Sequence, residues 1–198
     1  MIHVLQIQNP KTASSSLETA LTKLHNQKAI KYTHRHGHTL GRNIIRQYNK
    51  AQRSNAIILC SVRNPYDRLL SAYQYVRQFK EEQRDHQSLS FYFTIPSFKQ
   101  FCLSLPHFYE RNFFLKPQHE WFLSKKKKML PTHILRFESL KKDWKHFLLE
   151  YNLPIIKLPT IRKTKHHSWK TYYDKEMLKA VGEFYRKDFK LLNYPMLG

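Results

Sequence analysis

The first seventeen residues of the chain predict a strand, a turn and a helix in immediate succession. Residues 3–7 are mainly aliphatic, as in a short buried strand. From Ser14 onward, leucines recur at spacings of four and three residues, which predicts a helix with one buried face. The turn between them, residues 9–16, is rich in hydroxyl groups and carries one lysine, Lys11. This succession is the unit from which α/β folds are built.

The turn suits a bound phosphate group. Free backbone N–H groups of the first helical turn point toward such a loop, and the helix dipole favours an anion there. Lys11 adds a positive charge, and the hydroxyls of Thr12, Ser14, Ser15 and Ser16 add hydrogen-bond donors. One alternative stays open from these residues alone, namely a serine that only caps the helix. The turn contains no glycine, so it does not fit the G-x-x-x-x-G-K-[ST] loop of nucleoside triphosphatases.

The composition bounds the class of protein. A chain of 198 residues is long enough for one domain with a substantial core. Its formal charge of +21 attracts anions. The charge alone does not indicate whether the partner is nucleic acid, a nucleotide, an acidic polysaccharide or a lipid headgroup. No apolar run approaches the ~18 residues of a membrane span, and the N-terminus lacks a signal-peptide pattern. Cys60 and Cys102 are expected to be reduced core thiols. We therefore expect a soluble, cytoplasmic protein.

A second candidate anion site follows the most apolar stretch of the chain. Residues 56–62 form a nearly continuous apolar run, typical of a central parallel strand. Arg63 follows directly, and an asparagine–proline pair then starts a helix that carries Arg68 and Ser71. The carboxyl ends of strands in open α/β sheets are where ligands bind. The alternative is that the arginines pair with Asp67 or with other carboxylates.

Three histidines follow the second expected strand, residues 29–33. In an extended segment His34, His36 and His38 would face one side. A metal site, a surface loop and a positioned general base all stay open, although no Cys, Asp or Glu lies within the stretch.

The remaining chain continues the alternation of strands and helices. Residues 40–53 predict a basic helix, and residues 80–90 are polar and lack periodicity. Residues 132–137 predict a strand and residues 138–150 a helix. Asp174 is expected to cap a last helix whose buried stripe continues from Leu178 to Leu192. This alternation predicts a single α/β domain over residues 1–198, with a central parallel sheet flanked by helices.

Two of these stretches resemble motifs of the sulfotransferase superfamily, in particular its carbohydrate-type family 2 branch. Residues 9–17, Asn-Pro-Lys-Thr-Ala-Ser-Ser-Ser-Leu, are similar to the 5′-phosphosulfate loop. Residues 61–73 are similar to the 3′-phosphate motif, whose binding residues fall on Arg63 and Ser71. Three segments, at 117–122, 135–143 and 185–194, also resemble family landmarks. The chain departs from the pattern in having no glycine in the first loop and no Golgi signal-anchor of the kind found in eukaryotic relatives.

The resemblance implies a P-loop-like fold and a sulfotransferase activity. The donor would be 3′-phosphoadenosine 5′-phosphosulfate (PAPS), the nucleotide product adenosine 3′,5′-bisphosphate, and no metal would be needed. The acceptor would be a hydroxyl of a saccharide or glycolipid, including one that is already anionic. His38 would be the base, with His36 orienting it, although the order could be reversed. The residues expected to bind the cofactor are Lys11, Thr12, Ala13, Ser14, Ser15, Ser16, Arg63, Ser71, Lys163 and Lys165.

The expected chemistry agrees with these residue types. Sulfuryl transfer, like phosphoryl transfer, depends mainly on positioning and on charge stabilisation. Lys11 would neutralise charge on the bridging oxygen, and a histidine is suited to take the acceptor proton near neutral pH. A kinase, the first competing class, needs glycine in the loop and an aspartate for magnesium. The second, a basic nucleic-acid-binding module, does not explain two separate anion loops. We therefore expect no nucleic-acid partner, while peripheral membrane contact and the oligomeric state stay open.

Overall fold

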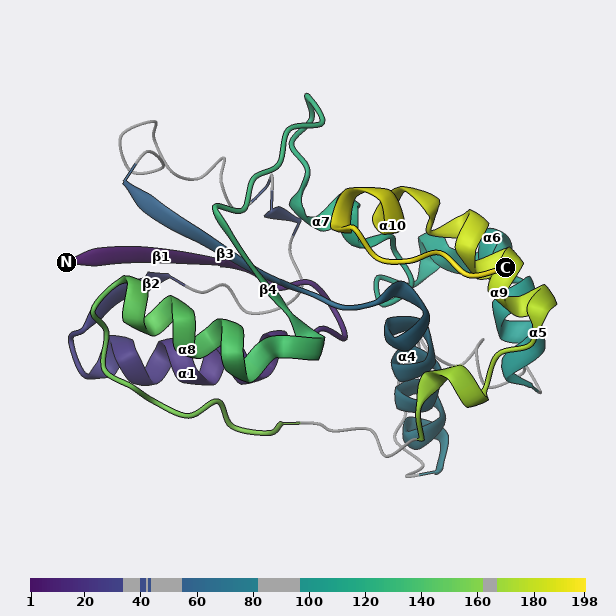
Figure 1. The fold of residues 1–198 in the computed structure, drawn as a ribbon, viewed down its shortest axis with the longest axis horizontal. Helices are drawn as coiled ribbons and strands as arrows, with labels where there is room; N and C mark the ends of the chain where they lie inside the picture. Colours follow the sequence, from purple (N-terminus) through teal and green to yellow (C-terminus); the bar gives the residue numbers. More distant parts are fainter. Residues whose placement is uncertain (34–39, 42, 44–54, 82–96, 162–166) are drawn as a thin grey trace. The chain divides into compact units, whose positions relative to one another are not determined.

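The computed structural model describes residues 1–33, 40, 41, 43, 55–81, 97–161 and 167–198 (Figure 1). The chain divides into two compact units. Unit 1 comprises Met1–Arg63 and Gln118–Arg162, and unit 2 comprises Asn64–Pro117 and Lys163–Gly198. Each unit is therefore assembled from two separate stretches of sequence.

Unit 1 contains a parallel sheet of four strands in the order β2-β1-β3-β4. The strands are β1 (Ile2–Ile7), β2 (Ile30–Thr33), β3 (Ala56–Val62) and β4 (His133–Arg136). Each strand was expected within one residue of these bounds. The predicted α/β fold with a central parallel sheet is confirmed.

The register of the sheet fixes which loops meet. Ile7, the last residue of β1, lies opposite Cys60 of β3, which in turn lies opposite Ile134 of β4. Because the strands are parallel, the turn after β1 and Arg63 after β3 leave the sheet at the same edge. The two candidate anion-binding stretches therefore begin side by side.

Two helices, α1 (Ser14–Asn26) and α8 (Leu140–Glu150), cover one face of this sheet (Figure 1). Their apolar stripes pack on alternate residues of the strands, as the period of two in a strand requires. The side chains of this core are Val4, Leu17, Ala20, Leu21, Leu24, Ile30, Tyr32, Ile57, Leu59, Leu135, Trp144, Phe147, Leu148 and Leu153.

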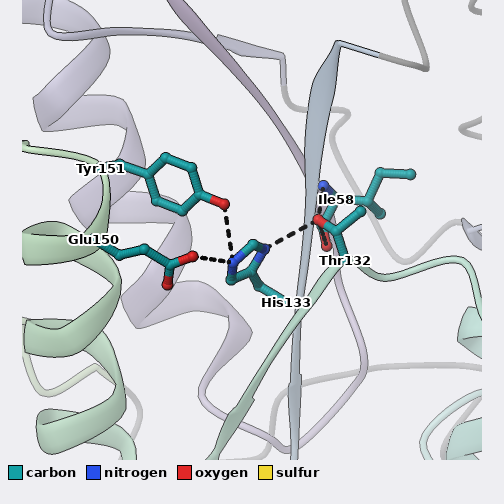
Figure 2. A network of polar contacts seen from close by, with 5 residues as sticks. All are labelled: Ile58, Thr132, His133, Glu150 and Tyr151. Carbon is teal, nitrogen blue, oxygen red and sulfur yellow. Dashed lines mark hydrogen bonds and ion pairs between the residues drawn. The ribbon is translucent and has the colours of Figure 1, made fainter.

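A polar cluster attaches the end of α8 to the start of β4 (Figure 2). His133 Nε2 lies 3.1 Å from a carboxylate oxygen of Glu150 and 3.0 Å from the hydroxyl of Tyr151. Its Nδ1 lies 3.1 Å from the hydroxyl of Thr132, which also accepts a hydrogen bond from Ile58 N–H. The cluster joins strand, helix and neighbouring strand in a part of unit 1 where side chains are half exposed.

Unit 2 is built from helices around an aromatic core (Figure 1). Tyr66 lies at its centre, with its ring centroid 5.2 Å from that of Trp169 and 4.7 Å from that of Phe189. The helices that the structure describes in unit 2 are α4 (Pro65–Glu81), α5 (Phe98–Leu103), α6 (Leu105–Phe108), η2 (Tyr109–Arg111), η4 (Trp169–Thr171), α9 (Lys175–Phe184) and α10 (Arg186–Leu192).

Asp174 caps α9 as expected, by accepting a hydrogen bond from Met177 N–H. The expectation of one continuous last helix was wrong, because the helix ends at Phe184 and a second one begins at Arg186. Tyr185 separates them, and its hydroxyl donates to the carbonyl of Leu115. This long-range contact fixes the ring at the break, where the apolar periodicity of the sequence continues without interruption.

Among the described residues, unit 1 also contains two short helices, α7 (Gln118–Phe122) and η3 (Phe137–Ser139). Most of the basic helix expected over residues 40–53, and most of the polar segment 80–90, lie outside the described residues. Within the described parts of the chain, no helix combines the length and the apolar character that a membrane crossing requires.

Candidate active site

The turn between β1 and α1 has a backbone that glycine usually supplies. Lys11 and Ala13 have φ values of 64° and 66°, in the left-handed region. Residues other than glycine rarely adopt this backbone conformation, because their Cβ atom comes too close to the following carbonyl oxygen. Strain of this kind concentrates at binding sites, where the surrounding structure holds it. The turn therefore lacks the glycines of common phosphate loops while still adopting glycine-like geometry at two positions.

The first turn of α1 is left without a side-chain cap. Ala13 is the N-cap residue, and its methyl group makes no capping hydrogen bond. The serine-cap alternative is therefore wrong. Ser16 N–H and Leu17 N–H bond to the carbonyl of Ala13 at 3.1 and 3.2 Å, which leaves the earlier N–H groups of the helix directed toward the turn. No acidic residue lies in this first turn of α1, so the positive end of the helix dipole is not neutralised there.

The hydroxyl groups of the turn divide into two kinds. Thr12 is fully buried, and its hydroxyl donates to the Asn9 carbonyl at 2.8 Å and lies 2.8 Å from the hydroxyl of Ser61. Thr12 thus attaches the turn to the end of β3. Ser14 and Ser16 are also largely buried, whereas Ser15 is half exposed.

Arg63 lies against the turn. Its guanidinium carbon is 3.8 Å above the ring centroid of Phe137, and Nη1 donates to the Lys11 carbonyl at 3.3 Å. An arginine stays charged throughout the physiological range, and stacking on an aromatic ring holds its plane in place. The structure therefore brings together Lys11 and Arg63, which the sequence assigned to opposite ends of one nucleotide.

A buried glutamine, Gln118, connects these stretches. Its Nε2 donates to the Arg63 carbonyl at 2.7 Å, and its Oε1 accepts from Arg63 N–H and from Asn9 Nδ2, each at 3.0 Å. Asn9 Nδ2 also donates to the Ser61 carbonyl at 3.1 Å. Sequence reasoning placed this residue in a family-like segment but gave it no role. The proline–glutamine pair at the start of α7 was the only signal.

Ser71 and Arg68 both lie on α4 in unit 2, and both are buried. The guanidinium of Arg68 donates to the carbonyls of Phe114 and Lys116 at 3.1 and 2.6 Å. It therefore holds a backbone segment of its own unit, a role that neither sequence alternative foresaw.

The candidate histidines His34, His36 and His38 lie outside the described residues, as do Lys163 and Lys165. Gly41, three positions beyond His38, is described. A Cβ atom there would lie 2.6 Å from Ile7 Cδ1 and 2.6 Å from the Trp121 carbonyl oxygen. The chain that follows the histidines thus packs closely against the end of β1.

Groups suited to metal or thiol chemistry are not assembled in the described parts of the chain. No set of three or more His, Cys, Asp or Glu side chains gathers there as metal ligands would. Burial raises the pKa of the Cys60 thiol far above its ordinary value, so the thiol stays protonated.

A family model described as "Sulfotransferase family" matches residues 3–195. The match covers nearly the whole chain and includes the turn, Arg63 and Gln118. The chain therefore belongs to the sulfotransferase family, in its family 2 branch, and is a sulfotransferase. It transfers a sulfuryl group to an acceptor substrate, which separates it from the kinases and the nucleic-acid-binding modules considered above. No match to this chain was found among curated proteins or among solved structures.

Proposed function

We propose that this enzyme uses PAPS as donor and a hydroxyl of a saccharide or glycolipid as acceptor, within a single domain spanning residues 1–198. The observation that supports the donor most strongly is the start of α1. An uncapped helix end, a turn with two left-handed residues and the charge of Lys11 converge at one edge of the sheet. Backbone N–H groups and a lysine arranged in this way fit a phosphate ester, and the donor supplies the sulfuryl group attached to it.

The residues of the turn would have different roles in binding and transfer. The N–H groups of Ser14 and Ser15 would hold the 5′-phosphate, since they precede the first intrahelical hydrogen bonds. Lys11 would neutralise the negative charge that develops on the bridging oxygen during transfer. Thr12 would act through its contacts with Asn9 and Ser61, which fix the turn.

Arg63 is the described residue best suited to the 3′-phosphate. Its position beside Lys11 supports this role, because one bisphosphorylated nucleotide would need cations for both of its phosphates. The assignment of Ser71, Lys163 and Lys165 to the same phosphate stays a prediction.

We assign the general base to His38, with His36 as the residue that orients it or the acceptor. The packing of Gly41 against Ile7 supports this choice, because Gly41 lies three positions after His38 and contacts the last residue of β1. A neutral imidazole there would take the proton of the acceptor hydroxyl as the new S–O bond forms.

Thermal denaturation with two nucleotides tests the choice of donor. At a hundredfold excess over its Kd, adenosine 3′,5′-bisphosphate should stabilise the protein by about 2.7 kcal/mol, a melting shift of several degrees. The shift should persist in the presence of a chelator, and ATP should give less. A shift with ATP and magnesium but none with the bisphosphate would overturn the proposal.

A further inference from the structure

Just beyond the end of β3, the side-chain amide of Gln118 makes the two backbone hydrogen bonds that a neighbouring strand would otherwise make. β3 ends at Val62, which pairs with Arg136 of β4. At the next residue, Arg63, both backbone groups are bonded by one side-chain amide, the N–H by Oε1 and the carbonyl by Nε2 of Gln118. Paired bonds of this kind define the position of the Arg63 backbone, and with it the origin of the Arg63 side chain.

The same amide also holds the turn that carries Lys11. Gln118 Oε1 accepts a second hydrogen bond from Asn9 Nδ2, whose other hydrogen goes to the Ser61 carbonyl. Arg63 N–H identifies Oε1 as the acceptor, so the orientation of both amides follows from the backbone. The glutamine therefore bonds at once to the two segments that carry Lys11 and Arg63.

The network is sealed from solvent. Gln118, Asn9 and Ser61 each have no exposed surface. Hydrogen bonds in such surroundings are not exchanged for bonds to water, so a lost partner leaves a buried polar group unsatisfied. Substitution of Gln118 would thus affect Asn9 and Arg63 together. The Asn9 side-chain amide and the Arg63 backbone groups would lose a hydrogen bond that water does not replace.

We propose that Gln118 is a positioning residue that sets the spacing between the two cationic stretches of unit 1, so that both can bind one bisphosphorylated ligand at the same time. The inference rests on the proposed function. A ligand held at two points gains affinity only when the spacing of the two sites matches its own. Gln118 would act through the position of Arg63, which binds the second phosphate, and would not touch the ligand itself.

The test compares two nucleotides in wild type and in two variants. Gln118→Met keeps the length of the side chain but removes all three hydrogen bonds, and Gln118→Glu removes the donor to the Arg63 carbonyl. We expect each variant to bind adenosine 3′,5′-bisphosphate about tenfold more weakly. The ratio of the Kd for adenosine 5′-monophosphate to the Kd for the bisphosphate should fall, because the monophosphate engages only the turn.

Asn112→Ala is the matched control for stability. Asn112 is a buried amide of unit 2 that accepts a hydrogen bond from Phe114 N–H. This variant should lower the melting temperature while the ratio of the two dissociation constants stays at its wild-type value. If Gln118 only stabilised the fold, its two variants would likewise lower the melting temperature without changing this ratio. If the ratio is unchanged in both Gln118 variants, the inference is wrong.

A second measurement does not depend on nucleotide binding. Amide hydrogen exchange should become faster in peptides covering residues 8–13 and at Arg63 in Gln118→Met, while exchange within β2 stays unchanged. Unaltered exchange in both segments would also overturn the inference. If wild type binds neither nucleotide, the proposed donor is wrong, and the exchange data alone then decide whether Gln118 joins the two segments.

Discussion

At the scale of single residues, the left-handed backbone of Ala13 is the most informative feature of the site. Its φ of 66° places an alanine where glycine would be unstrained. The alanine side chain makes no capping bond there, so only the backbone of this residue contributes to the start of α1.

We therefore predict that Ala13→Gly keeps binding of adenosine 3′,5′-bisphosphate and does not lower the melting temperature. Relief of left-handed strain is worth ~1–2 kcal/mol, and the greater freedom of glycine in the unfolded chain offsets ~0.4–1 kcal/mol of it. Ala13→Val, with a branched side chain at the same φ, should lower the melting temperature by several degrees. Equal losses of stability in the two variants, measured by thermal denaturation, would contradict this reading of the turn.

The base assignment is also tested residue by residue. His38→Ala should lower turnover by ~10²–10⁴ while the melting shift with the bisphosphate remains. His36→Ala should have the smaller effect of the two if it only orients its neighbour.

His133→Gln provides a control histidine, because the His133 ring contacts Glu150 of α8 and Thr132, the residue before β4, rather than the turn. It should lower stability but leave turnover close to that of wild type. Near-normal turnover in both His36→Ala and His38→Ala would place the base elsewhere.

At the scale of elements, the attachment of the turn to β3 is the feature to test. Thr12 and Ser61 share a buried hydrogen bond, and Thr12 also bonds the Asn9 carbonyl. Thr12→Val and Ser61→Ala should each destabilise the protein by ~1–3 kcal/mol, because a buried polar partner is left unsatisfied. Urea denaturation of the single and double variants should give a coupling energy of at least ~0.5 kcal/mol. Strictly additive losses would show that the two hydroxyls do not stabilise each other.

Elements were largely predictable because their signals are local. The apolar runs of β1 and β3 and the leucine spacing of α1 identified them within a residue or two. Gln118 was not predictable as a site residue, because its partners lie 55 and 109 positions away and no local pattern encodes such bonds. The break at Tyr185 escaped prediction for the same reason, since its hydroxyl bonds Leu115, 70 positions earlier.

At the scale of the whole molecule, the formal charge of +21 should dominate encounters with anionic acceptors. We predict that the affinity for an anionic saccharide falls steeply as salt rises, since exposed charges are screened over about 10 Å at 0.1 M. The dissociation constant should be measured between low and physiological salt for anionic and neutral saccharides of equal length. An affinity that does not respond to salt would argue for a neutral acceptor.

In the proposed function, the nucleotide donor binds at the edge of the sheet beyond β1 and β3, through Lys11 and Arg63. Calorimetric titration of adenosine 3′,5′-bisphosphate into wild type, Lys11→Ala, Arg63→Ala and Lys142→Ala, all without magnesium, tests it most directly. Lys142 is an exposed lysine of α8 and controls for the general loss of one positive charge. We predict binding in wild type and in Lys142→Ala, with at least tenfold weaker binding in the other two variants. Equal affinities in all four proteins would contradict it.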